Sequence, residues 1–169
     1  MPGESSTTRP FASASTDVLL DDTNRRLLSA LGEDPRSSMS ALARQVGMSA
    51  PAVTERVQRL ERAGVITGYR LDVDPAALGM PVTAFARVRP SPGQLSKIAD
   101  LAQSLPEVTE CHRVTGEDCF LIKVHGASVA ALETVLDRFL VHGQTVTSIV
   151  VSTPVPPRPL SVAPDVGRA

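Results

Sequence analysis

Two short amphipathic segments within residues 38 to 64 constrain the fold of this chain more than any other stretch. They meet at Gly47, a residue type that ends helices because it adopts the left-handed conformation without steric cost. Ser49 follows as a candidate N-cap of the second segment. The apolar residues of both segments recur at helical spacing: Leu42, Ala43 and Val46, then Val53, Val57 and Leu60. The pattern predicts two helices joined by a tight turn.

The other faces of the second predicted helix carry hydroxyl, amide and guanidinium groups, which read base edges and bind phosphates in DNA. Two helices joined at a glycine also occur in other proteins, so charge supplies a second argument. Residues 36 to 70 hold six arginines against two glutamates, a net charge of +4 in a chain whose formal total is −1. We therefore expect a face that binds double-stranded DNA. Its candidate contacts are Arg36, Ser38, Ser49, Ala50, Ala52, Thr54, Arg56, Gln58 and Arg59.

The composition excludes several classes of protein. With 169 residues, 42% hydrophobic and 21% charged, the chain suits a soluble protein of one large or two small domains. No apolar run approaches the roughly 20 residues that span a bilayer, and the N-terminal residues lack a secretory signal. With two cysteines and no export signal, we expect a cytoplasmic protein with no membrane partner.

The residues that would support catalysis or metal binding do not group in the sequence. No cluster of acid, base and nucleophile and no phosphate-binding glycine loop is present, so we expect no enzyme. The three histidines lack metal-ligand spacing, so we expect no metal and no cofactor. Cys111 and Cys119 are expected to be buried, reduced thiols, because a hairpin turning near Gly116 places residue 111 opposite about residue 122.

The first half of the chain predicts a small helical domain. Residues 1 to 16 are rich in Ser, Thr and Ala, which is typical of a disordered tail. Leucines at helical spacing predict a further helix over residues 17 to 33, and the resulting three-helix DNA-binding domain occupies residues 17 to 67. Residues 65 to 74 turn to an extended pattern, either a hairpin acting as a wing or a single strand. We place a linker strand or arm at residues 68 to 80.

The second half alternates strand-like and helix-like segments. Strand patterns occupy residues 82–88, 108–115, 119–125 and 145–153, and helix patterns occupy residues 94–105 and 129–142. The order β-α-β-β-α-β is that of a ferredoxin-like fold, a four-stranded antiparallel sheet with both helices on one face. We expect this domain over residues 81 to 155, followed by a Pro-rich tail over residues 156 to 169. The uncovered sheet face is expected to meet a second copy of the chain.

Three stretches carry a family resemblance: LDDTNRRLLSAL, ALARQVGMSAPAVTERVQRLERAGVITGY and CHRVTGEDCFLIKV. With them the chain resembles the Lrp/AsnC (leucine-responsive, feast/famine) family of bacterial transcriptional regulators over about residues 18 to 155. The resemblance implies an α+β protein, with an N-terminal winged helix-turn-helix domain and a C-terminal ferredoxin-like βαββαβ domain. It implies a sequence-specific DNA-binding transcriptional regulator that responds to a small effector, with an amino acid as the expected class.

Family members pair through their sheets, and such dimers commonly assemble into octamers, so the resemblance implies a homodimer that forms a higher oligomer. The sequence leaves dimer, tetramer, octamer and hexadecamer open. The effector is implied to bind where two dimers meet, near the loop between the second and third strands. In this chain the corresponding residues are Thr115, Gly116, Glu117, Asp118, Cys119 and Phe120, together with Thr145, Thr147 and Ser148 of the last strand.

Each of these loop residues has an expected role. The bare backbone of Gly116 suits a carboxylate, Glu117 or Asp118 could pair with an ammonium group, and Phe120 offers an apolar wall. The family commonly places an acid and then an aromatic at the third and fourth positions after the glycine, where this chain has Cys119 and Phe120. Asn24 also replaces an acid, which we interpret as a capping or surface change.

These departures keep two alternatives open. One is an architectural DNA-binding protein without an effector, and the other is a stand-alone amino-acid sensor. Affinity for DNA that falls steeply with salt would argue against the sensor, because each phosphate contact releases counterions.

Overall fold

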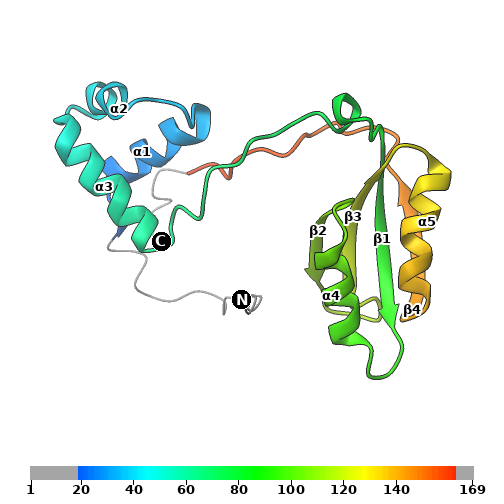
Figure 1. Ribbon diagram of the computed structural model, residues 1–169. Coiled ribbons are helices and arrows are strands. Elements are labelled where there is room, and N and C mark those ends of the chain that lie inside the picture. Colours follow the sequence, from blue (N-terminus) through cyan, green and yellow to red (C-terminus); the bar gives the residue numbers. More distant parts are fainter. Residues whose placement is uncertain (1–18, 163–169) are drawn as a thin grey trace. The chain divides into compact units, whose positions relative to one another are not determined.

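The structure is a computed structural model that describes residues 19 to 162. The disordered tail predicted over residues 1 to 16 and the end of the Pro-rich tail, residues 163 to 169, lie outside the described residues. The chain divides into two compact units (Figure 1). The helical unit runs to Arg70 and includes the segment from Pro157 onwards, and the sheet unit spans Leu71–Pro156.

Three helices build the helical unit: α1 (Asp22–Glu33), α2 (Met39–Val46) and α3 (Ala50–Arg62). α1 begins later than predicted because Asp21 caps it, accepting a hydrogen bond of 2.7 Å from the backbone N–H of Asn24. Ser38 caps α2 in the same way, and Gly47 ends it at φ 71°. The predicted pair of helices and its turn are thereby confirmed.

One apolar core holds the three helices together. Its buried residues are Leu27, Leu31, Leu42, Ala43, Val46, Val53 and Val57. Met48 in the turn between α2 and α3 and Ile66 after α3 pack against this core. α3 therefore presents its apolar stripe inward and its remaining faces outward, as the spacing of Val53, Val57 and Leu60 predicted.

The segment after α3 leaves the helical unit without forming a strand. Residues 67 to 74 have no strand partner within the described chain, so the hairpin considered from the sequence is not formed there. The Tyr69 hydroxyl donates a hydrogen bond of 3.0 Å to Glu61 Oε1 of α3, which ties the start of this segment to the helix. Pro75–Leu78 then makes a single 3-10 turn that ends at Gly79.

The sheet unit has the predicted βαββαβ order. Its elements are β1 (Val82–Pro90), α4 (Leu95–Ser104), β2 (Val108–Arg113), β3 (Phe120–Gly126), α5 (Val129–Leu140) and β4 (Gly143–Ile149). The strands lie in the order β2-β3-β1-β4, and every neighbouring pair is antiparallel. This topology confirms the ferredoxin-like fold.

Alternation along β1 decides which face of the sheet the helices cover. Ala84, Ala86 and Val88 are buried in one core with residues of α4 and α5. Phe85, Arg87 and Arg89 alternate with them and are exposed. Both helices therefore lie on one face (Figure 1), and the other, which we call the open face, has no cover within the described chain.

The chain after β4 has no regular structure. Residues 150 to 162 form neither helix nor strand, and residues 151 to 161 are exposed. Pro159 approaches α1, where its Cβ lies 3.5 Å from the position that a Cβ on Gly32 would take. The start of the predicted Pro-rich tail thus meets the helical unit.

Candidate DNA-binding face and effector site

The residues predicted to contact DNA lie on α3 and around the start of α2. Arg36, Ser38, Ser49, Gln58 and Arg59 are exposed, and Ala50, Ala52, Thr54 and Arg56 are half-buried. Ser49 is the N-cap of α3, yet its side chain makes no capping hydrogen bond. Thr54 Oγ1 instead donates to the carbonyl of Ala50 in the same helix, at 2.9 Å. Of the predicted DNA contacts on α3, only Gln58 and Arg59 are therefore exposed.

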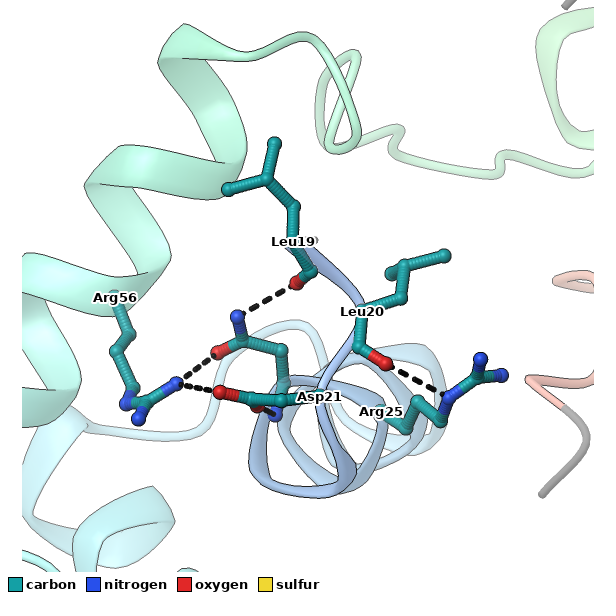
Figure 2. Close-up of polar contacts among 6 residues, drawn as sticks. Leu19, Leu20, Asp21, Arg25 and Arg56 are labelled. Atoms are coloured by element: carbon teal, nitrogen blue, oxygen red, sulfur yellow. Dashed lines mark hydrogen bonds and ion pairs between the residues drawn. The ribbon is translucent and has the colours of Figure 1, made fainter. Parts of the chain in front are cut away.

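Arg56 is arranged differently, because its guanidinium is bound to the start of α1 (Figure 2). Its Nη1 donates hydrogen bonds of 2.7 Å to Asp21 Oδ2 and 3.0 Å to Asn24 Oδ1. Asn24 is only 5% exposed, and its Nδ2 donates to the carbonyl of Leu19 at 2.7 Å. Asn24 is thus a buried member of a polar network, which corrects its interpretation as a capping or surface change.

This network keeps the Asp21 carboxyl ionised. The hydrogen bond from Arg56 lowers the pKa of Asp21 below its ordinary value of 3.8 and, with the N–H of Asn24, outweighs the effect of partial burial, which raises it. At neutral pH one carboxylate therefore both caps α1 and binds Arg56 of α3.

Two arginines of β1 hold the loop between β2 and β3. Arg89 forms an ion pair with Glu117, and its Nε lies 3.6 Å from Asp118 Oδ1. The Nε of Arg87 lies 3.8 Å from Asp118 Oδ2. Both loop acids that were expected to receive an ammonium group therefore already have a cationic partner. Gly116 has φ 114°, a conformation that favours glycine.

The residues predicted to bind an effector divide between the two faces of the sheet. Thr145 and Thr147 pair with Val88 and Ala86, so they lie on the helix side. There they line a groove of about 310 Å³ against α5, with Val129, Leu132, Glu133, Leu136, Asp137 and Ile149. Ser148 pairs with Phe85 on the open face, the side that carries the two arginines holding the loop. A single chain therefore does not bring the whole predicted set together.

Phe120 also departs from its expected role. It is 3% exposed and packs in the core with Ile122, because it begins β3 on the covered face. This burial corrects the prediction that its ring forms an apolar wall of the effector site. Of the remaining loop residues, Thr115, Gly116 and Glu117 are exposed and Asp118 and Cys119 are half-buried.

Cys111 pairs with Ile122 across β2 and β3, as the sequence predicted, and both cysteines are free thiols. Neither is buried, however: Cys111 is exposed, because β2 lies at an edge of the sheet, and Cys119 is half-buried. Partial desolvation nevertheless raises the pKa of the Cys111 thiol.

Sequence reasoning missed a polar network on the open face. His125 is 6% exposed, with Nδ1 3.0 Å from Thr83 Oγ1 and Nε2 3.1 Å from Thr109 Oγ1. Beside it Lys123 Nζ donates to Glu110 Oε1 at 3.1 Å. Desolvation and the charge of Lys123 lower the pKa of His125, while Glu110 opposes them. Only the register of three strands brings these residues together, so no local pattern could have found them.

Comparison with known proteins identifies the chain. Residues 83–160 match the Lrp/AsnC ligand binding domain, and residues 20–67 match a winged helix-turn-helix DNA-binding family. The HTH-type transcriptional regulator LrpC of Bacillus subtilis is 33% identical over 133 residues, which cover 79% of this chain and 92% of that protein. The chain belongs to the Lrp/AsnC family.

Further relatives agree with this assignment to the Lrp/AsnC family. Regulatory protein AsnC of Escherichia coli K12 is 37% identical over 125 residues, covering 71% of this chain and 80% of that protein. The crystal structure of a transcriptional regulator from Neisseria meningitidis, a complex with L-Met, matches with a TM-score of 0.75 at 27% identity and covers 80% of this chain and 92% of that one. This Lrp/AsnC protein is therefore a DNA-binding transcriptional regulator with a ligand-binding domain, and not an enzyme.

Two further observations concern residues 19 to 162. No helix in this range is long and apolar enough to cross a membrane. No three histidine, cysteine, aspartate or glutamate side chains in the same range are grouped as a metal site would require.

Proposed function

We propose that this Lrp/AsnC regulator binds specific sites on double-stranded DNA in the cytoplasm, as a homodimer or a larger assembly, and that a free amino acid modulates this binding. The exposed Gln58 and Arg59 of α3, on a three-helix unit that shares one apolar core, carry the first part of the proposal. Gln58 and Arg59 suit base edges, and Ser49, Ala50, Ala52 and Thr54 lie nearer the start of the helix. Arg36 and Ser38, exposed beside α2, suit phosphates.

Exposed apolar side chains support assembly. On the open face Phe85 is 37% exposed and Val146 is 49% exposed. Along the linker Tyr69, Leu71 and Val73 alternate and are 52%, 84% and 48% exposed. Apolar surfaces of this kind are removed from water when two copies pair. We propose that the open faces pair in a dimer, that the linker segments of the two copies join the same contact, and that an octamer is the larger assembly.

The division of the effector residues supports a site shared between subunits. Glu117 and Asp118 of one subunit would meet the groove at Thr145 and Thr147 of another, because in one chain these acids pair with arginines of the open face and the threonines lie on the helix side. The N. meningitidis neighbour with L-Met supports an amino acid as the chemical class.

Two measurements test the proposal. Fluorescence anisotropy with a duplex selected from a random pool, at 50 to 200 mM salt, should show affinity that falls steeply with salt and prefers the selected site. A thermal-shift screen of the amino acids, read together with light scattering, should find one that changes stability and assembly together. Affinity that is indifferent to both salt and sequence would contradict DNA regulation by this protein.

A second candidate, an architectural DNA-binding protein without effector, is favoured by one observation. Arg87 and Arg89 already form ion pairs with both acids of the loop, so neither acid is left unpaired to bind an ammonium group. In that case the anisotropy titration would give nearly equal affinities for selected and scrambled duplexes, and no amino acid would change the melting temperature.

A further inference from the structure

Arg56 lies on the recognition helix, yet its hydrogen bonds are made within the protein. One nitrogen, Nη1, donates both to Asp21 Oδ2 and to Asn24 Oδ1 (Figure 2). Both acceptors belong to the start of α1: Asp21 is its N-cap and Asn24 lies in its first turn. A guanidinium on α3 is thus joined to two groups whose positions the cap of α1 already fixes.

The contact differs in kind from the apolar packing beside it. Burial of Val53, Val57 and Leu60 determines which face of α3 turns inward, but apolar attraction has little directional preference, so it sets the rotation of the helix only coarsely. Hydrogen bonds of 2.7 and 3.0 Å depend on direction as well as distance. Rotation of α3 about its axis would move Gln58 and Arg59 across the groove and would break these two bonds first.

We propose that Arg56 is a positioning residue for DNA recognition, which sets the rotation of α3 against α1 through Asp21 and Asn24 so that Gln58 and Arg59 meet the DNA. The inference rests on the proposed DNA binding. The rival role is a direct phosphate contact, which the 33% exposure of the Arg56 side chain leaves sterically open. In that role Asp21 would compete with phosphate for the guanidinium.

The two roles predict opposite effects for changes at Asp21. Serine is as good an N-cap as aspartate, so Asp21→Ser keeps the cap of α1 and removes the partner of Arg56. For a positioning residue, Asp21→Ser and Arg56→Ala each reduce the ratio of specific to scrambled-duplex affinity by about fivefold, and the double variant is no worse than either single one. For a phosphate contact, Asp21→Ser leaves affinity unchanged or increases it.

The experiment titrates the full-length protein and its variants against selected and scrambled duplexes over a salt series. Arg36→Ala is the matched control, since it removes an exposed arginine that we assign to a phosphate, and it should reduce the slope of log affinity against log salt by about one. Arg56→Ala should leave that slope unchanged. Circular dichroism establishes that each variant is folded. If Arg56→Ala does not fold, Asp21→Ser alone distinguishes a positioning residue from a phosphate contact.

A lower salt slope for Arg56→Ala, or a tighter complex for Asp21→Ser, would overturn the inference. Full specificity in both Arg56→Ala and Asp21→Ser would also overturn it, because the contact of Arg56 with Asp21 and Asn24 would then contribute to stability alone. If the unaltered protein itself did not prefer the selected duplex, the proposed function would fail instead, before any variant was compared.

Discussion

The Nε of Arg89 lies 3.6 Å from Asp118 Oδ1. Arg89, the last residue but one of β1, therefore holds the loop between β2 and β3. The Arg89 side chain also pairs with Glu117, and Arg87, two residues earlier in β1, pairs with Asp118. The loop that the family resemblance associates with an effector is therefore closed by charge in the single chain. These pairs are partly exposed, so each is individually weak and sensitive to salt.

We expect Arg89→Ala to loosen this loop without unfolding the sheet. Since an exposed ion pair contributes roughly 0.2–1 kcal/mol, hydrogen exchange of residues 115 to 119 should become at most about fivefold faster. Arg113→Ala is the control, because within the described chain Arg113 at the end of β2 has no ion pair. Equal exchange in the unaltered protein and both variants would show that Arg89 does not restrain the loop.

Gly143→Ala should destabilise the sheet unit far more than Gly116→Ala. A Cβ at Gly143 would lie 2.1 Å from the carbonyl oxygen of Arg89, on the neighbouring strand, so the pairing of β1 and β4 would have to shift. A Cβ at Gly116 meets nothing within 4 Å, and the cost there is the strain of φ +114°, roughly 1–2 kcal/mol. Urea denaturation of the two variants checks the order, and equal midpoints would contradict it.

A bulky residue at Gly116 should abolish any effect of an amino acid on assembly, while DNA binding persists. The loop has room for a side chain in the single chain, but a ligand carboxylate held by the bare backbone would lose its place. Gly116→Leu, examined by light scattering with and without the amino acid found in the thermal-shift screen, makes the comparison. An intact response would remove Gly116 from the proposed site.

Acidification should destabilise the sheet unit through His125. Desolvation lowers the pKa of this imidazole below its ordinary 6.5, so near and below that pH the unfolded chain binds more protons than the folded one. The stabilisation is complete above pH 6.5 and is lost as pH falls through the lower folded pKa. The groups around the ring are Thr83, Thr109, Lys123 and Glu110.

His125→Gln should therefore make the melting temperature less dependent on pH. Between pH 7.5 and pH 5 the unaltered protein should lose a few degrees more than the variant, on the order of the shift that about 1 kcal/mol produces. His112→Gln, at a histidine whose side chain is 60% exposed, is the control and should behave like the unaltered protein. Parallel pH profiles for all three proteins would exclude His125 as the source.

A charge on the open face should prevent pairing of sheets. Phe85 and Leu95 are both 37% exposed, but Phe85 lies on the open face of β1 and Leu95 lies in the first turn of α4. Phe85→Glu should shift the assembly to monomers, because pairing would bury a carboxylate in place of an aromatic ring. Leu95→Glu should leave it intact. Light scattering coupled to size-exclusion chromatography measures both, and an unchanged Phe85→Glu assembly would move the interface elsewhere.

Local patterns predicted much of this fold, and contacts between distant segments explain what they missed. Gly47 ended α2 as its position predicted, and the pairing of Cys111 with Ile122 followed from counting along a hairpin. The partner of Arg56 lies 35 residues away on another helix, so no periodicity indicated it. Burial of Asn24 likewise depends on how α1 packs, and not on its neighbours in sequence.

Some features of the candidate site follow from the sequence alone. The two-residue period of a strand already separates Thr145 and Thr147 from Ser148, whose side chain must lie on the other face. Phe120 required knowledge of where β3 begins, and strand ends are the least certain part of such predictions. The ion pairs of Arg87 and Arg89 needed the strand order, which the sequence does not state directly.

Two threonines of β4 and the acidic loop stand on opposite sides of one sheet. If a small molecule bridges two subunits there, as we propose, its uptake and their association strengthen each other by the same factor. The dose of metabolite needed for a response then falls as the regulator becomes more abundant. A protein built in this way would respond jointly to nutrient supply and to its own copy number.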